Sequence, residues 1–355
     1  MKRASRIIIS ILLTAGFLYL FLFSEDGLDF KAVWRSINEA NLALISLSVA
    51  LILAAYVVRA WRWRYLLDPI RQGLGMYNLL STTMIGFMIS FLVPFRAGEV
   101  VRPVLLARRE RFSASAAFAT VAVERLLDAL TVMLLFLVFT LTAHGDAILL
   151  GSAGEGTEAS ELLRHGLKGA SLLVAFGLPL VALLVAFPRA LLSILDRVVP
   201  GGRSGRLAAA FSFLEKFLTG LGALRRMREL IGSVTLSLLM WLMIGYSIHL
   251  ATRAFDLRLI FLDTFLLLLP LTIGIAMPTP GGVGPYEYLC QRSLADFWGV
   301  PVDVAAAVAV TLHAISLVPT ILAGLAFMWR DGVRPREVSA LRSAGDVPSG
   351  PVEDS

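Results

Sequence analysis

Eight apolar stretches divide this chain, and they constrain its fold more than any other feature. They cover residues 6–23, 43–61, 76–93, 115–142, 167–187, 231–252, 262–277 and 303–328. A helix needs about 20 apolar residues to cross a bilayer, so 262–277 is short and 76–93 is marginal. Only 16% of the residues are charged, whereas a soluble domain carries about 25%. The sequence therefore predicts an all-α polytopic membrane protein.

The N-terminal stretch 6–23 follows the basic residues Lys2, Arg3 and Arg6, as in a signal peptide. It is longer than a usual signal h-region and lacks an A-x-A cleavage site, so we expect an uncleaved first span. The single cysteine, Cys290, excludes an intramolecular disulfide and a cysteine metal cluster. The histidines have no metal-ligand spacing, so we expect no metal and no cofactor. The net charge of +6 fits basic cytoplasmic loops better than nucleic-acid binding.

The charges between the apolar stretches predict which loops face the cytoplasm. Arginines gather in 59–75, 94–114 and 188–230, which we place inside together with the N-terminus and the tail. Acidic residues gather in 24–42 and 143–166, which we place outside. A membrane domain over 1–330 is expected to end in a cytoplasmic, disordered tail over 331–355. Both termini are therefore predicted to be cytoplasmic.

Both flanks of the stretch 76–93 are basic, which conflicts with a full crossing. We therefore predict a re-entrant hairpin that enters from the cytoplasm and returns to it. The short stretch 262–277 and its continuation then form a second hairpin, which enters from outside. The result is about six full spans plus two re-entrant hairpins. Eight full spans are the alternative.

The two halves of this arrangement have opposite orientations, which predicts an inverted repeat of the kind found in transporters. A weak sequence pattern supports it. Pro-x-x-x-Gly begins at Pro94 and again at Pro278, each time about thirty residues before a polar residue inside the next span. Those polar residues are Glu124 and His313.

The first polar motif inside an apolar region is "PFRAGEVVRP", which begins at Pro94. Pro94 and Gly98 are predicted to stop the helix, and irregular backbone is tolerated at membrane depth where it lines a wet cavity. Arg96 and Arg102 suit an anionic group such as a lipid phosphate. Glu99 can orient one arginine or contact a cationic headgroup. The alternative is that these arginines only anchor the chain at the cytoplasmic interface.

The second motif is "AVERLLDAL", inside the longest apolar stretch. Glu124 and Asp128 share a helix face at i,i+4, and Arg125 can pair with Asp128 at i,i+3. Ionisable groups inside a membrane usually face a bundle interior or a cavity. We predict a polar network that these residues share with the arginines of the first motif. The alternative is a long helix that overhangs the bilayer and leaves them at the interface.

The third motif is "MPTPGGVGPYEYL", in which prolines and glycines exclude a regular helix. The irregular part of this motif is predicted to begin at Pro278. The freed amides of Gly281, Gly282 and Gly284 are predicted to form an anion-binding nest, and Glu287 adds a carboxylate. A purely structural turn is the alternative.

A fourth motif, "RAWRWRYLLDP", alternates arginines with aromatic residues. Its members are Arg59, Trp61, Arg62, Trp63, Arg64 and Tyr65. We interpret it mainly as an aromatic and positive-inside anchor at the membrane interface. Arg62 is a further candidate for binding a lipid headgroup.

These motifs together identify a family. The order "RAWRWRYLL", "GFMISFLVPFRAGEVVRPVLLARR", "AVERLLDAL" and "MPTPGGVGPYE" resembles the lysylphosphatidylglycerol synthase transmembrane region, also called the flippase-like integral membrane family. The resemblance covers roughly 5–330. It implies a multi-pass protein of the bacterial inner membrane, related to the half that moves aminoacylated phosphatidylglycerol between leaflets. The positions that match the family's motifs are Arg96, Glu99, Arg102, Glu124, Arg125 and the 278–287 loop.

The resemblance does not imply lipid synthesis, because the chain ends at Ser355 and leaves no room for the cytosolic aminoacyl-transferase domain. We therefore expect a lipid flippase or translocase that binds membrane lipids through their phosphate, and not an enzyme. No P-loop occurs, so we expect passive or gradient-driven movement. The alternatives are a lipid-binding accessory for a separate lipid-modifying enzyme, and an intramembrane transferase.

Overall fold

The computed structural model describes residues 3–23, 27–142 and 227–334, with a few isolated positions beyond them. Over these residues the chain forms ten α-helices and one 3-10 turn. The elements are α1 (Arg3–Leu22), α2 (Phe30–Glu39), α3 (Leu42–Leu67), α4 (Met76–Leu92), α5 (Gly98–Glu110), α6 (Ala114–Thr140), α11 (Met227–Ala254), α12 (Asp263–Ala276), η3 (Pro280–Gly282), α13 (Pro285–Trp298) and α14 (Val302–Arg330). The predictions for 143–166, 167–187, 188–230 and the tail 331–355 lie outside the described residues, except at their edges.

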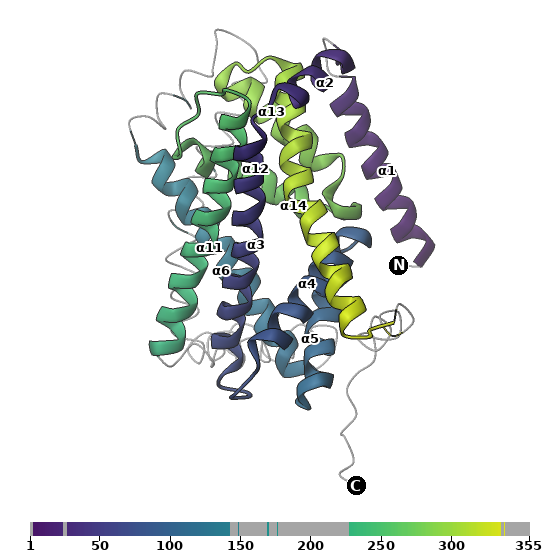
Figure 1. The fold of residues 1–355 in the computed structure, drawn as a ribbon, viewed down its shortest axis with the longest axis vertical. Helices are drawn as coiled ribbons and strands as arrows, with labels where there is room; N and C mark the ends of the chain where they lie inside the picture. The colour runs from purple at the N-terminus through teal and green to yellow at the C-terminus, as the bar shows by residue number, and fades with distance from the viewer. Residues whose placement is uncertain are drawn as a thin grey trace, which may run out of the picture.

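The described residues confirm an all-helical membrane protein. Three helices, α3, α11 and α14, are long and apolar enough to cross a bilayer, and shorter apolar helices accompany them. Helix α6 is 27 residues long, but three charged residues interrupt its apolar sequence at Glu124, Arg125 and Asp128. These four long helices run along the long axis of the molecule (Figure 1).

The loop predicted over 24–42 contains a helix that its hydropathy did not indicate. Helix α2 begins because the Asp29 side chain accepts a hydrogen bond from the Lys31 amide at 2.8 Å, which is a standard N-cap. The next helix, α3, begins in the same way, since the Asn41 side chain accepts from the Ala43 amide at 3.0 Å. The caps at Asp29 and Asn41 therefore convert an expected loop into a helix and a tight corner.

Helices α3 and α11 are antiparallel, and small polar residues join them. Ser48 Oγ donates to the Ser247 carbonyl at 2.8 Å, and Ser247 Oγ donates to the Ser48 carbonyl at 3.1 Å. The start of α3 meets the end of α11, where the Asn41 amide donates to the Ala254 carbonyl at 2.9 Å. Small residues allow such close backbone approach between apolar helices.

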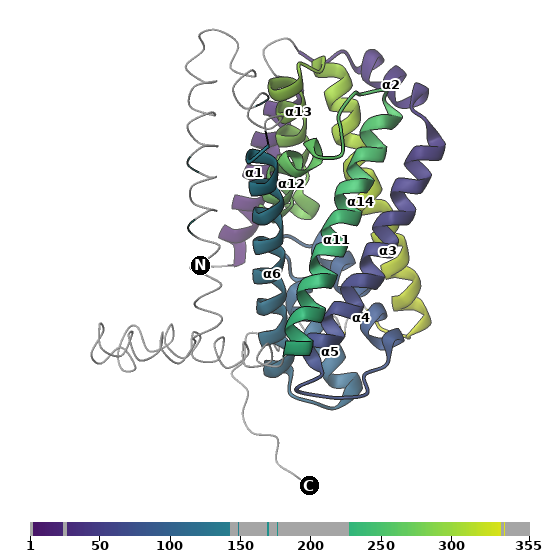
Figure 2. The ribbon, with the colours of Figure 1, turned by 90° about the vertical axis from the view of Figure 1, so that its left-hand side faces the viewer.

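Two pairs of short helices occupy opposite ends of the molecule. In both views α4 and α5 lie in the lower half, and α12 and α13 lie in the upper half (Figures 1 and 2). The breaks between the paired helices meet near the middle. A methyl group on Gly281 of η3 would lie 3.1 Å from the carbonyl oxygen of Phe91, near the end of α4.

The break in the first pair differs in detail from the prediction. The left-handed residues are Phe95 and Arg96, with φ of 64° and 51°, and not Gly98. Gly98 is the first residue of α5, and a methyl group there would lie 1.7 Å from the Gly86 carbonyl oxygen. Gly98 is needed because α4 and α5 touch at their backbones.

The break in the second pair is shorter than predicted. Its irregular part ends at Gly284, and Pro285 takes the first position of α13, where its missing N–H costs nothing. The second half of the glycine-rich motif is therefore regular helix. In the irregular part, Gly281, Gly282 and Gly284 all have positive φ.

The lower end of α14 is tied to the first pair of short helices. Asp331, directly after α14, accepts hydrogen bonds from Tyr77 Oη at 2.6 Å and from Ser81 Oγ. It also forms an ion pair with Arg109 Nη1 at 2.6 Å. Burial raises the pKa of Asp331, but these partners outweigh it and hold the pKa below its usual value.

Candidate functional site

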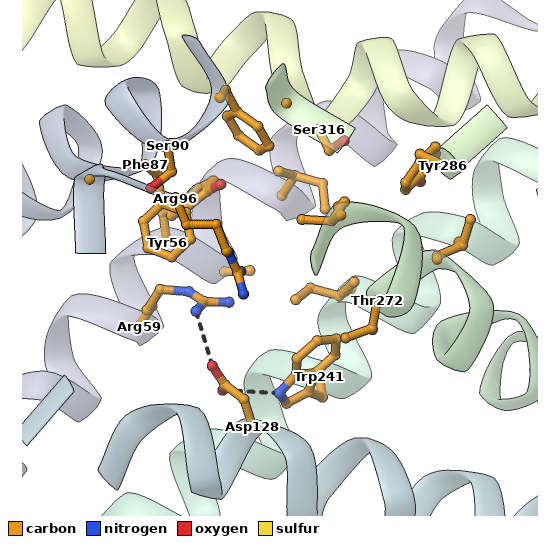
Figure 3. A pocket seen from close by; sticks show the side chains of 18 of the residues that line it. Tyr56, Arg59, Phe87, Ser90, Arg96, Asp128, Trp241, Thr272, Tyr286 and Ser316 are labelled. Carbon is orange, nitrogen blue, oxygen red and sulfur yellow. Dashed lines mark hydrogen bonds and ion pairs between the residues drawn. The ribbon is translucent and has the colours of Figure 1, made fainter. Parts of the chain in front are cut away.

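A cavity of about 390 Å³ lies between the two breaks. Its walls come from α3, α4, α5 and α6 on one side and from α11, α12, η3, α13 and α14 on the other. The volume falls in the range of sites for small ligands, about 300–1,000 Å³. Figure 3 shows its side chains converging from both halves of the chain.

Asp128 of α6 is one centre of the charged side chains at the cavity. It accepts hydrogen bonds from Arg62 Nη1 at 2.6 Å, from Trp241 Nε1 at 3.2 Å and from Arg59 Nη1 at 3.3 Å. The contacts with Arg59 and Trp241 are dashed in Figure 3. Helix α3 supplies both arginines because its residues 59 and 62 are three apart and so share one face.

Glu124, one turn earlier on α6, is completely buried. It accepts from Arg102 Nη1 at 3.0 Å and from Arg125 Nη2 at 2.9 Å. Arg62 Nη2 lies 3.2 Å and Arg59 Nη1 lies 3.5 Å from its Oε1. One carboxylate thus holds four guanidinium groups, which would repel one another without it.

Arg96 and Glu99 form the more accessible edge of the network. Arg96 Nε lies 3.3 Å from Glu99 Oε1, and both side chains are about one-third exposed, at 32% and 30%. Arg125 Nη1 approaches the same carboxylate at 3.8 Å. In Figure 3 the Arg96 side chain enters the cavity toward Arg59 and Asp128. The two left-handed residues at 95 and 96 turn the chain where this side chain enters.

Several donors in this network have no acceptor. Nε and Nη2 of Arg102 are buried without a hydrogen bond, and its guanidinium stacks on the Trp63 ring at 3.8 Å. Among the described residues, Arg96 makes an ion pair but no hydrogen bond. Arg59 lies over the Phe87 ring at 4.7 Å. Aromatic faces support the cations without neutralising them.

The opposite wall of the cavity is apolar. Its members include Ile248, Leu268, Leu271, Leu312 and Ile315, from α11, α12 and α14. The cavity therefore combines a cationic end with a hydrocarbon wall. This is the combination that an amphipathic molecule with an anionic group requires.

A second buried polar pair lies beside the cavity in the other half. His313 Nδ1 is 2.6 Å from Glu287 Oε1, and His313 Nε2 is 2.9 Å from the Gly281 carbonyl oxygen. The pair corresponds to Arg102 and Glu124, since each joins the helix after a break to the long helix that follows. Glu124 and His313 are the polar residues that follow the two Pro-x-x-x-Gly patterns in the sequence. Each of them takes part in one of these two pairs.

Two of the three amides predicted to form an anion-binding nest in the glycine loop already have partners within the loop and α13. The Gly284 amide donates to Glu287 Oε2 at 2.7 Å, and the Gly282 amide contacts the Thr279 carbonyl at 3.4 Å. The carboxylate of the chain itself therefore occupies the position of an anion. Gly284 also faces α1, because a methyl group there would lie 3.0 Å from the Thr14 carbonyl oxygen.

The structure separates the predicted site residues into two groups. Those that line the cavity are Arg96, Gly98, Glu99, Arg102, Arg125, Asp128 and Gly281. Those that do not line it are Arg62, Glu124, Pro278, Gly282, Gly284 and Glu287. Arg62 and Glu124 still act on the site, because they form ion pairs with residues that line it.

Sequence reasoning missed Arg59, Tyr56, Phe87 and Trp241, all of which line the cavity. The anchor interpretation of the fourth motif is wrong for Arg59, Arg62 and Trp63, which are 7%, 0% and 0% exposed. The sequence did contain a signal for the burial of the two arginines. Arg59 and Arg62 are three residues apart and so share one helix face. Trp241 had no such signal, because it lies in a uniformly apolar helix.

Comparison with known proteins adds three findings. The profile of the lysylphosphatidylglycerol synthase transmembrane region matches residues 7–324. The glycosyltransferase AglD of Haloferax volcanii is 26% identical over 353 residues, which cover 92% of this chain and 54% of that protein. The UPF0104 membrane protein MJ1595 of Methanocaldococcus jannaschii is 29% identical over 145 residues, 40% of this chain and 41% of that protein. The chain thus spans about half the length of the curated relatives it matches.

Proposed function

Because this chain belongs to the lysylphosphatidylglycerol synthase transmembrane-region family, we propose that it moves an anionic lipid between the two leaflets of a membrane. The phosphate of the headgroup binds at the cationic end of the cavity, beside Arg59, Arg96, Arg102 and Arg125. The acyl or prenyl chain follows the apolar wall.

The observation that carries this proposal is the unsatisfied cation cluster at the meeting point of the two breaks. Buried arginine N–H groups without acceptors are costly, and a phosphate supplies oxygens in the geometry that guanidinium groups bind best. The cluster faces a cavity and not a packed core.

The arrangement of helices supports the topology expected from the charges. We propose that α4–α5 and α12–α13 are re-entrant hairpins that enter from opposite faces of the membrane. Each pair occupies one end of the molecule and returns to the same end (Figure 1). The two halves then form an inverted repeat whose breaks meet at the site, as in transporters with discontinuous helices.

The positive-inside pattern supports a plasma-membrane location with both termini in the cytoplasm. In that orientation the α4–α5 hairpin opens from the cytoplasm, and the α12–α13 hairpin opens from outside. A headgroup bound between the two breaks then lies inside the membrane, between the two faces. Alternating opening of the two hairpins would expose it to one leaflet at a time.

Purified protein in liposomes tests the proposal through exchange of a labelled anionic phospholipid between leaflets. We expect exchange by the native chain and a rate at least tenfold lower for Arg96→Ala and for Glu99→Gln. Arg108→Ala is the matched control, because Arg108 is on α5, exposed and without a partner among the described residues. Native protein that produces no exchange in any vesicle would contradict the proposal.

A second candidate follows from a relative's name. This chain matches 54% of a protein named a glycosyltransferase, so it could instead bind lipid for a separate lipid-modifying enzyme or perform a transfer inside the membrane. Co-purification with such an enzyme, without leaflet exchange, would favour the accessory role. Formation of a glycosylated lipid by the purified chain, without a partner, would favour the transferase.

A further inference from the structure

We infer that the cavity selects lipids whose phosphate carries two negative charges, a phosphate monoester, over lipids with a singly charged phosphodiester. This inference rests on the proposed function for its lipid, and it adds the charge and class of the headgroup. It follows from the balance of buried charges, from the unused donors and from the neutrality of the rest of the cavity.

The charge balance comes from one connected network. Its cations are Arg59, Arg62, Arg96, Arg102 and Arg125, and its anions are Glu99, Glu124 and Asp128. Over the residues that the structure describes, five guanidinium groups against three carboxylates leave two positive charges. These charges lie mostly out of contact with water, where an uncompensated charge is strongly unfavourable.

A ligand with two negative charges neutralises this network, whereas a phosphodiester leaves one positive charge without a partner. The second ionisation of a phosphate monoester has a pKa of about 6, so the monoester carries nearly two charges above neutral pH. It also offers three terminal oxygens as acceptors, and a diester has only two. Both properties favour the monoester at a site with several unused donors.

The unused donors point to the same ligand. Nε and Nη2 of Arg102 have no hydrogen bond although the residue is 2% exposed. Arg96 has an ion pair through Nε but no hydrogen bond among the described residues. Arg59 uses Nη1 for both of its carboxylate contacts. These three arginines, from α3, α5 and the break between α4 and α5, all line the same cavity.

The other half of the cavity does not change this balance. The Gly281 carbonyl can only accept, so His313 Nε2 must carry the proton in their 2.9 Å contact. The 2.6 Å contact between His313 Nδ1 and Glu287 Oε1 needs one further shared proton. The histidine and the carboxylate are then neutral as a pair. No other charged side chain lines the cavity among the described residues.

Lipid retention measures the selectivity without requiring transport. Detergent-purified full-length protein is mixed at pH 8 with equal amounts of phosphatidic acid and phosphatidylglycerol of identical acyl chains, and bound lipid is quantified by native mass spectrometry. We expect phosphatidic acid to be retained at least about tenfold better, the effect of one additional charge-assisted contact. Equal retention of the two lipids would overturn the inference.

Two variants test the charge balance itself, and both change residues that are about one-third exposed, so that folding is preserved. Arg96→Gln leaves one net positive charge and should reduce the preference for the monoester to near unity. Glu99→Gln leaves three net positive charges and should maintain or increase the preference for the monoester. Arg108→Gln should leave the preference unchanged. A ratio that is the same in all four proteins would overturn the inference.

Two further ligands in the same retention experiment identify the source of the phosphate. Farnesyl phosphate tests whether a prenyl monoester is retained like phosphatidic acid, and inorganic phosphate tests whether the lipid chain is needed. Millimolar inorganic phosphate that displaces both lipids completely would contradict a lipid ligand. Selective retention without leaflet exchange would refute the proposed transport and leave the headgroup selectivity intact, so the two failures are distinguishable.

Discussion

Single side chains determine whether the charged network can exist inside a membrane protein. Glu124 contacts four arginines, and one of them, Arg102, has no ion pair with another carboxylate among the described residues. Removal of one partner from a buried network leaves the others unpaired, and this is more damaging than replacement of the whole network by apolar residues.

Glu124→Gln is therefore expected to lower the free energy of unfolding by about 3–5 kcal/mol. The substitution preserves shape but removes the negative charge that holds Arg102 and Arg125 together. Thermal unfolding in a fixed detergent measures the effect. Glu39→Gln, at an exposed position of α2, is the control. An unchanged unfolding temperature for Glu124→Gln would refute this role.

The sequence predicted several members of this network, because charges inside an apolar stretch are conspicuous. Arg96, Arg102 and Asp128 were identified in that way, and each lines the cavity. Arg59 was assigned to the membrane interface because it belongs to a basic flank. Its pairing with Asp128 joins residues 69 positions apart, and only the packing of α3 against α6 brings them together.

At the scale of elements, the broken helix pairs differ most from simple apolar spans. Hydropathy predicted α4 and α12 within one or two residues. It did not predict α5 and α13, because charged and polar residues, among them the buried Arg102 and Glu287, reduce their hydrophobicity. The breaks were located from proline and glycine, but the strained residues of the first break are Phe95 and Arg96.

Gly98→Ala is expected to separate α4 from α5. The added methyl group would meet the Gly86 carbonyl oxygen at 1.7 Å, so backbone and not a flexible side chain must move. We expect a loss of about 1–3 kcal/mol in stability, as for other overpacked sites, and a weaker lipid interaction because Arg102 moves with α5. Gly75→Ala, at a glycine with a φ of −68° and open space around it, serves as the control for added bulk. Equal stability of the two variants would contradict the close packing.

The contact of Asp331 with α4 and α5 predicts an acid-sensitive component of stability. Its folded pKa lies below the ordinary value of about 3.9, so its contribution is complete above that value and is lost as the pH falls through the lower folded value. Native protein and Asp331→Asn should therefore differ in unfolding temperature at pH 6 and converge as the pH falls below about 4. A difference that persists unchanged at low pH would exclude this assignment.

At the scale of the whole molecule, the two halves place their pairs of short helices at opposite ends (Figure 2), and the two breaks approach each other at Phe91 and Gly281. The prediction of two hairpins came from basic residues on both sides of 76–93, and the arrangement of α4 and α5 is consistent with it. Distances between the halves, such as that between Phe91 and Gly281, could not be predicted, because they depend on how α3 and α11 cross at Ser48 and Ser247.

Single cysteines test the proposed topology in a Cys290→Ala background, since the native cysteine is buried. An impermeant maleimide added to intact cells should label Asp256→Cys, between α11 and α12. It should not label Arg71→Cys, before α4, or Arg108→Cys, near the end of α5. All three positions are exposed, and they should react equally once the membrane is permeabilised. Labelling at 108 but not at 71 would show that α4 crosses the membrane.

The initial rate of leaflet exchange in proteoliposomes tests most directly whether the central cluster carries a lipid phosphate. The decisive comparison is native protein, Arg59→Gln and Arg108→Gln at equal protein per vesicle, because Arg59 lines the cavity and Arg108 does not. The loss of one charge-assisted contact predicts a rate about tenfold or more lower for Arg59→Gln, with Arg108→Gln equal to native. Equal rates for all three proteins would contradict the account.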